Sequence, residues 1–181
     1  VRLPGFVVSD EYEDADQALH SLCHDGLRKR NLEGIKIYTD RLNKELEVIQ
    51  ERGFAKYFLT MKAVSDEAQS LSLVGPARGS AAGALISYLL DITQVDPLEY
   101  DLLFERFLTR SGSGYPDIDY DVANPMRLKE HLIDKWGNNV VVPISNFNTL
   151  GLRSLVKDIA KFYDVPFTEV NAVTSKMLLE A

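Results

Sequence analysis

Three aspartates at every second position, Asp117, Asp119 and Asp121, constrain the fold of this chain more than any other feature. Side chains of an extended segment alternate between its two faces, so the three carboxylates are predicted to point the same way. Carboxylates held this close together repel one another unless a cation lies among them. Hard oxygen ligands of this kind suit Mg²⁺ or Mn²⁺. The pattern therefore predicts a strand at residues 116–122 that carries a metal site, although such a run taken alone is more often a solvated edge or loop.

A second feature, the turn Arg78-Gly79-Ser80, lies upstream and is predicted to open a helix that runs through Leu90. Free backbone N–H groups at a helix start, together with the positive end of the helix dipole, bind phosphate. Metal-binding acids combined with a phosphate-binding turn are typical of an enzyme that transfers nucleotidyl groups. A simpler interpretation also stands, in which Ser80 only caps the helix and Arg78 is a surface charge.

Composition limits the class of protein. The 181 residues are 45% hydrophobic and 26% charged, as in one ordinary globular domain or slightly more. A single cysteine, Cys23, excludes an internal disulfide, and no apolar run is long enough to cross a membrane. We therefore expect a cytoplasmic protein without membrane contact. The net charge of −7 argues against a generic basic nucleic-acid binder, although a carboxylate metal site itself adds negative charge.

The spacing of apolar residues predicts strands and helices that alternate up to residue 147, followed by helices alone. Particular residues set some of the ends. Gly53 ends one helix, and Asn124-Pro125 begins another that stops at Gly137. We expect helices near residues 15–27, 40–52, 80–90, 97–103, 125–136, 149–163 and 167–179, and strands at 71–74, 116–122 and 140–142.

Several ordered motifs together resemble one family, the alpha subunits of bacterial DNA polymerase III, which are the C-family replicative polymerases. The matching stretches cover nearly the whole chain at the family's separations, so the set is specific although no single motif is. They are residues 45–59 (ELEVIQERGFAKYFL), 74–83 (VGPARGSAAG), 96–98 (DPL), 103–108 (LFERFL) and 116–119 (PDID), with a looser match at 147–158.

The resemblance implies an α/β (α+β) fold: a palm of the polymerase-beta-like nucleotidyltransferase type with flanking helices, followed by the helical start of a thumb. It assigns residues 1–148 to the first segment of the palm and residues 149–181 to the thumb. It also implies a DNA-directed DNA polymerase. The implied partners are primer–template DNA, deoxynucleoside triphosphates and other replisome subunits, including a sliding clamp.

The resemblance further implies that Asp117 and Asp119 are the catalytic residues and hold two Mg²⁺ ions, for which Mn²⁺ can substitute. The metals would lower the pKa of the primer 3′-hydroxyl and stabilise the leaving pyrophosphate. Asp121 is either an outer group of this site or simply solvated. The family also has a third catalytic Asp and a Lys, in a palm segment that follows the thumb and has no match in these 181 residues. We therefore expect the chain alone to lack useful polymerase activity.

For the nucleotide, the resemblance implies that Gly79 and Ser80 bind the β- and γ-phosphates, and that Arg78 and Arg106 add charge-assisted contacts. From its own context, Arg106 could instead pair with Glu105 or another acid. The sequence departs from the family pattern at 109–112, where Thr-Arg-Ser-Gly replaces Asn-Pro-Glu-Arg. The arginine contact that the family draws from this loop is therefore in question, with Arg110 as the candidate replacement. A milder departure is Ala77, where the family has Gly.

Three basic residues, Arg153, Lys157 and Lys161, recur four apart and are predicted to share one helical face. Such a face could follow the phosphates of duplex DNA, and it could equally be an ordinary solvated surface.

Two other functions stay open at this point. One is another polymerase-beta-like nucleotidyltransferase that acts on a different acceptor, against which the match at 103–108 argues. The other is a non-catalytic module that binds nucleotide or partner subunits, which stays open because the third Asp is missing.

Overall fold

The computed structural model describes residues 14–112 and 114–177, and every regular element within them is a helix. The chain divides into two compact units, Val1–Val142 and Pro143–Ala181. Since no strand forms in this described part of the chain, the predicted α/β sheet is absent from it. None of the described helices is both long and apolar enough to cross a bilayer.

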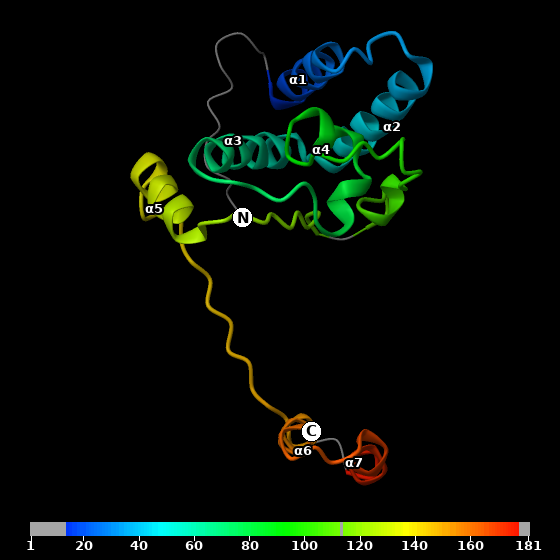
Figure 1. Cartoon of the computed structure of the whole chain (residues 1–181). Helices are drawn as coiled ribbons and strands as arrows, with labels where there is room; N and C mark the ends of the chain where they lie inside the picture. Colours follow the sequence, from blue (N-terminus) through cyan, green and yellow to red (C-terminus); the bar gives the residue numbers. More distant parts are fainter. Residues whose placement is uncertain (1–13, 113, 178–181) are drawn as a thin grey trace. The chain divides into compact units, whose positions relative to one another are not determined.

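A short helix, α4 (Leu85–Leu89), lies among the longer helices of the first unit (Figure 1), and four of its five residues are buried. Both α1 and α2 pack against α4, and α3 packs against α1. A Cβ at Gly26 of α1 would lie 2.4 Å from the Leu89 carbonyl oxygen, so the close crossing of α1 and α4 requires glycine at this position. The three surrounding helices are α1 (Ala15–Lys29), α2 (Lys36–Arg52) and α3 (Ala55–Leu71).

Residues with strong local signals set helix ends as predicted. Gly53 ends α2 in the left-handed conformation, with φ of 66°. The side chain of Asn124 accepts a hydrogen bond from the Arg127 backbone N–H at 3.0 Å and caps α5 (Pro125–Trp136). The start of α2 was predicted wrongly, because the helix begins at Lys36 without a side-chain cap.

The helix predicted at residues 80–90 is wrong in its middle, because two short helices form there. The 3-10 helix η1 (Gly79–Gly83) is followed by one extended residue and then by α4. The backbone N–H groups of Leu85 and Ile86 do not continue the helical ladder. They donate instead to the carboxylate of Glu45 in α2, each at 2.9 Å. A tertiary contact thus overrides the local helical preference.

Two other predicted elements are also wrong. Residues 97–101 form a turn rather than a helix, in which the Asp96 carboxylate accepts a hydrogen bond from the Leu98 N–H at 2.9 Å. An aspartate in this position stabilises a turn as readily as a helix start. Residues 140–142 form no strand, because no neighbouring strand is present in the described residues to complete a ladder.

The acidic segment, residues 116–122, is extended without belonging to a sheet. It makes one antiparallel bridge, Val74 with Val122, which is flanked by two backbone hydrogen bonds of 2.9 Å. The predicted strands at 71–74 and 116–122 are therefore reduced to this single pairing within the described part of the chain. Isolated pairing of this kind needs other contacts to hold it in place.

Side-chain packing supplies those contacts to the acidic segment. Ile118 and Tyr120 pack against the core, and the Tyr120 hydroxyl lies 2.8 Å from the Ser65 hydroxyl of α3, within hydrogen-bonding distance. The three aspartates between and beside them are exposed. The predicted alternation of faces is therefore present, although the sheet that usually imposes it is not.

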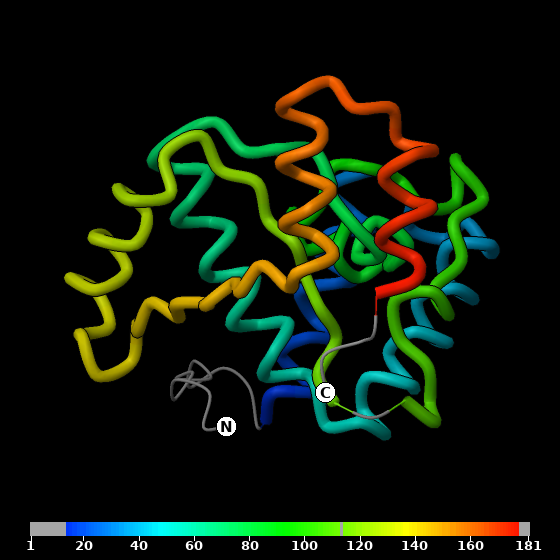
Figure 2. Tube along the Cα trace, turned by 90° about the horizontal axis from the view of Figure 1, so that it is seen from below, coloured from blue at the N-terminus to red at the C-terminus, as the bar shows by residue number. Residues whose placement is uncertain are grey.

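The second unit consists of two helices, α6 (Leu152–Phe162) and α7 (Phe167–Thr174), which run side by side in opposite directions (Figure 2). Val170 and Thr174 of α7 are buried, whereas no residue of α6 is. The helix predicted to reach residue 179 ends at Thr174, and residues 178–181 lie outside the described part of the chain. Residues 1–13 of the predicted palm lie outside it as well.

Candidate functional site

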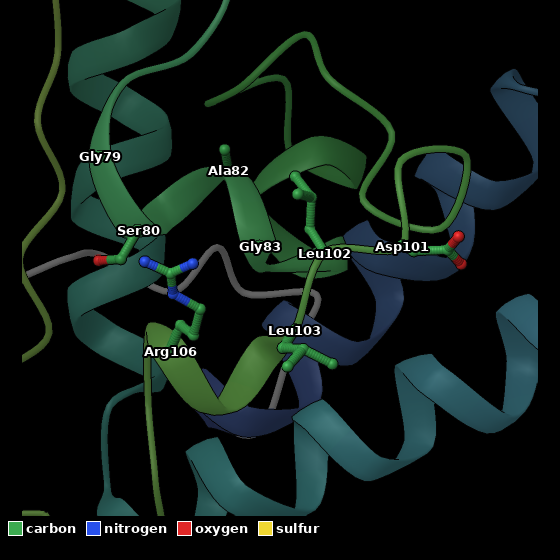
Figure 3. Close-up of a pocket in the computed structure, with 8 residues that line it drawn as sticks. All are labelled: Gly79, Ser80, Ala82, Gly83, Asp101, Leu102, Leu103 and Arg106. Atoms are coloured by element: carbon green, nitrogen blue, oxygen red, sulfur yellow. The ribbon is translucent and has the colours of Figure 1, made fainter.

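A pocket of about 590 Å³ opens between η1 and the segment 101–106 (Figure 3). The last three residues of that segment form a second 3-10 helix, η2 (Phe104–Arg106). Three of the residues predicted to bind the substrate meet at this pocket although the chain separates them by more than twenty positions: Gly79, Ser80 and Arg106. The remaining lining residues are Ala82, Gly83, Asp101, Leu102 and Leu103.

The guanidinium group of Arg106 is the cationic group of this pocket. It extends beside Ser80, while the Asp101 carboxylate points away from it (Figure 3). Glu105, the acid that could have neutralised Arg106, pairs with Lys44 instead. Arg106 makes no hydrogen bond or ion pair with any other residue that the structure describes, so its donors are open to an anionic ligand.

Gly79 brings the acidic segment against the turn. Its φ of 65° lies in the left-handed region, which favours glycine. A Cβ at this position would also lie 2.5 Å from Oδ2 of Asp119, closer than any side chain can approach. The Asp119 carboxylate therefore lies directly against the backbone of the predicted phosphate-binding turn.

Arg78 and Asp121 form an ion pair across the same turn, with Nη1 of Arg78 2.9 Å from Oδ1 of Asp121. The hydrogen bond to Asp121 and the charges of Asp121 and Asp119 raise the pKa of Arg78 above its ordinary value. Both side chains of the pair are more than half exposed. Arg78 does not line the pocket, and Asp121 is the partner of this arginine rather than a lone solvated acid.

Asp117 lies near Tyr57 of α3. Burial raises the pKa of Tyr57, the negative charge of Asp117 raises it further, and a backbone hydrogen bond from Ile118 lowers it. Neither Asp117 nor Asp119 forms a hydrogen bond or ion pair with another described residue, so their oxygens are open to a ligand. Exposed carboxylate oxygens on one side of a segment are suitable donors for Mg²⁺. Within residues 14–112 and 114–177, however, no three His, Cys, Asp or Glu side chains converge as a ready metal site.

Arg110, the candidate replacement for the family's loop arginine, does not line the pocket. It forms ion pairs with Glu47 and Glu51 on α2. The loop that carries Arg110 is held by Arg52, whose guanidinium donates to the carbonyl oxygens of Thr109 at 2.7 Å and of Gly114 at 3.0 Å.

The three basic residues of the second unit have different surroundings. Arg153 is half-buried and donates to the Met177 carbonyl oxygen, so it helps to hold the unit together. Lys157 donates to Asn171 at 3.2 Å and lies over the Phe167 ring. Lys161 is exposed and lines, with Lys157, a groove beside α7.

Sequence reasoning missed two residues that organise the pocket from behind, Arg41 and Glu45 of α2. The Glu45 side chain is completely buried, and burial raises its pKa to about 7 against the opposing effects of its hydrogen bonds and of Arg41. A signal for both was available. Glu45 adjoins the apolar stripe of its helix, and an arginine four residues earlier is placed to pair with it.

Comparison with known proteins identifies the family of the chain. The family model described as "Bacterial DNA polymerase III alpha NTPase domain" matches residues 17–181. Proteins named DNA polymerase III subunit alpha are similar over most of the chain. That of Halalkalibacterium halodurans is 40% identical over 182 residues, covering 97% of this chain and 16% of the relative.

Two further relatives carry the same name. The protein of Ureaplasma parvum is 37% identical over 166 residues, covering 88% of this chain and 17% of the relative. The protein of Bacillus subtilis is 38% identical over 167 residues, covering 91% of this chain and 15% of the relative. The chain thus spans about a sixth of the length of these relatives, and it belongs to the bacterial DNA polymerase III alpha family.

Proposed function

We propose that this chain is part of a DNA-directed DNA polymerase and that its pocket receives the triphosphate of an incoming deoxynucleotide. The observation that supports this most directly is the unpaired Arg106 guanidinium beside Gly79 and Ser80 in the pocket. Membership of the polymerase family supports the choice of substrate.

The chain's own groups supply complementary contacts to the phosphates. The Ser80 hydroxyl and the backbone N–H groups of the turn donate neutral hydrogen bonds, and Arg106 donates charge-assisted ones from the opposite wall. Arg78 is held by Asp121 outside the pocket, so it contributes to phosphate binding only after it leaves that carboxylate. Because η1 is a 3-10 helix of five residues, individual N–H groups contribute more here than a helix dipole does.

Asp117 and Asp119 are the residues that would hold Mg²⁺, or Mn²⁺ in its place. Bound metal ions would lower the pKa of the primer 3′-hydroxyl and neutralise charge on the leaving pyrophosphate. The contact of Asp119 with Gly79 places one of these carboxylates next to the phosphate-binding turn before any ligand arrives. A site shared by metal ions and a triphosphate requires a carboxylate this close to the phosphate-binding turn.

Family membership also supports the remaining proposals, which concern the domains and the partners. Residues 1–148 form a palm segment and residues 149–181 begin a thumb, in which Arg153, Lys157 and Lys161 lie near primer–template DNA. The whole protein works in the cytoplasm with other replisome subunits, including a sliding clamp. A third Asp and a Lys complete the catalytic set in the intact polymerase, so the present residues bind nucleotide without extending a primer.

Nucleotide titration tests the proposal. We expect dTTP to bind in the presence of Mn²⁺, and Arg106→Met to weaken binding about tenfold or more, because a charge-assisted contact is lost. Arg110→Met is the matched control, since it removes an equal charge that is engaged with Glu47 and Glu51 outside the pocket. Equal affinities of these two variants would contradict the assignment of the pocket.

A second titration tests the metal ligands. The double variant Asp117→Asn/Asp119→Asn should lose the Mn²⁺ binding that depends on dTTP, because amides replace the charged donors. An unchanged Mn²⁺ affinity in this variant would show that the acids are assigned wrongly. Primer extension by the unaltered chain would contradict the expected inactivity without affecting the nucleotide site.

A further inference from the structure

The two walls of the pocket are joined behind it by one side chain. Arg41 of α2 donates from the same nitrogen, Nη2, to the Gly83 carbonyl oxygen at 2.7 Å and to the Leu102 carbonyl oxygen at 3.1 Å. Gly83 is the last residue of η1, and Leu102 begins the segment that leads to Arg106. One guanidinium group therefore binds the ends of both walls.

The position of Arg41 is itself fixed by Glu45. Oε1 of Glu45 accepts a hydrogen bond from Nε of Arg41 at 2.7 Å and another from the Leu85 N–H at 2.9 Å. Its other oxygen accepts from the Ile86 N–H at 2.9 Å. The carboxylate thus links α2, the arginine and the start of α4, which directly follows η1. A planar guanidinium with all of these partners has little freedom to shift.

The two walls also touch directly. A Cβ at Gly83 would lie 2.7 Å from the Leu103 carbonyl oxygen, so the backbones approach as closely as glycine permits. Carbonyl oxygens from both walls converge on the same region, and without a donor they would repel one another. The guanidinium of Arg41 is the donor that holds them together.

We propose that Arg41 and Glu45 are positioning residues that fix the separation between the wall of Ser80 and the wall of Arg106. Neither of them lines the pocket. This inference rests on the proposed function in one respect: the separation is expected to set the affinity for a triphosphate. Phosphate oxygens must meet donors on both walls at hydrogen-bond distance, so a wider or variable gap weakens the contacts of one wall.

The test measures the separation and the affinity independently. Nitroxide labels on Ala82→Cys and Leu103→Cys, which line the two walls, report the distance between the walls by dipolar coupling. Cys23 does not interfere, because it is completely buried and burial raises its pKa. The dissociation constant for dTTP with Mn²⁺ is measured on the unlabelled chain. Arg41→Lys keeps the charge but loses the fork of donors, and Arg41→Met removes both.

Two control variants separate positioning from general effects. Lys36→Met removes a charge from the same helix, at a side chain whose one ion pair with a described residue is that with Asp40. Leu132→Ala destabilises a second cluster, between α3 and α5, whose members do not line the pocket but include Tyr120 and Val122 of the acidic segment. We expect both controls to keep the wall distance of the unaltered chain, and Lys36→Met to keep its dTTP affinity as well.

The Arg41 variants should show a longer or broader distance distribution and about tenfold weaker dTTP binding. If Arg41→Met does not fold, Arg41→Lys decides alone. An unchanged distance in a folded Arg41 variant overturns the proposal, and so does a changed distance with unchanged affinity. Failure of the unaltered chain to bind dTTP would contradict the proposed function instead, while the distance comparison would still decide whether Arg41 fixes the walls.

Discussion

The two halves of the candidate site are held in place by very different contacts. The pocket walls are tied to the core by Glu45, a buried carboxylate, and by Arg41, a largely buried guanidinium. The acidic segment, residues 116–122, has one backbone bridge, three half-buried side chains packed against apolar clusters (Ile118, Tyr120 and Val122) and exposed carboxylates. One half is embedded in the core of the first unit, and the other lies on its surface.

This difference has a consequence for how the two halves respond to change. Buried polar groups that are fully hydrogen-bonded hold one geometry, and breaking them is costly. Exposed carboxylates on a lightly anchored segment can shift by small amounts at little cost. On the proposed function, the pocket binds phosphates in a fixed geometry, whereas the acids adjust around a cation. Substitutions should affect stability strongly in the first half and weakly in the second.

The largest effect is expected from Glu45→Ala. The change leaves Arg41 without its anion and two N–H groups of α4 without their acceptor, so the free energy of unfolding should fall by roughly 3–5 kcal/mol. Urea unfolding followed by circular dichroism measures it. Glu51→Ala is the control on the same helix, because its ion pair with Arg110 is exposed and should contribute about 1 kcal/mol or less. Equal losses in the two variants would show that burial does not distinguish them.

The pH dependence of stability provides the second test. Burial raises the pKa of Glu45 from 4.5 to about 7, so the folded state binds this proton more tightly than the unfolded state does. The proton on Glu45 therefore stabilises the folded state fully below pH 4.5, and this stabilisation is lost as the pH rises through about 7. Relative to that of Glu45→Gln, the free energy of unfolding of the unaltered chain should fall by up to about 3 kcal/mol between these two pH values.

The comparison with Glu45→Gln is needed because other acids titrate in the opposite sense. Lys135 and His131 lower the pKa of Glu67, and Lys44 lowers that of Glu105, so both add stability as the pH rises from acid values. These contributions are common to both proteins and cancel in the difference. If the stability of the unaltered chain instead rose relative to that of the variant as the pH rose, Arg41 would lower the pKa of Glu45 by more than burial raises it.

The same contrast explains what the sequence could predict. Gly53, Asn124 and the alternating aspartates act through their own neighbours, and the helix ends and exposed faces that they predict are present. The break between η1 and α4 depends on Glu45, some forty residues earlier in the chain. No local pattern reveals which distant carboxylate will accept two backbone N–H groups.

The candidate site divides in the same way. The pattern of the turn pointed to Gly79 and Ser80, and the family resemblance added Arg106; the three residues meet at one pocket. The partners of charged residues could not be predicted, because several alternatives lie within reach on an unfolded chain. Thus Arg78 pairs with Asp121 outside the pocket, and Arg110 pairs with α2. Predicted strands failed for a related reason, since a strand also depends on partners elsewhere in the chain.

A third prediction addresses the junction between the two halves, where Gly79 meets Asp119. Gly79→Ala combines a left-handed backbone with a clash against Oδ2 of Asp119. Gly34→Ala is the matched control, because Gly34 has φ of 78° with nothing within 4 Å of its Cβ position. The control should cost about 1 kcal/mol, and Gly79→Ala up to about 1 kcal/mol more, because the exposed Asp119 carboxylate can turn aside at modest cost. Chemical unfolding of both variants measures the difference.

A double-mutant cycle identifies the source of that excess. In an Asp119→Ala background, Gly79→Ala should cost no more than Gly34→Ala, since the clashing carboxylate is gone. An excess that persists without the carboxylate would mean that the turn clashes with some other group and that the two halves do not meet at Asp119.

The smallest effect is expected from Asp121→Asn, which breaks the exposed ion pair with Arg78. Since both partners are more than half exposed, stability should stay unchanged within the precision of unfolding measurements. Binding of dTTP should tighten by no more than a few-fold, because Arg78 no longer has to leave a carboxylate. The gain in affinity should shrink at high salt, which screens exposed charges.

Arg78→Met combined with Asp121→Asn is the control, and it should abolish the gain in affinity. If Asp121→Asn weakened binding at all salt concentrations, Asp121 would be a ligand of the metal–nucleotide complex rather than a competitor for Arg78, and all three acids of the segment would then serve the site.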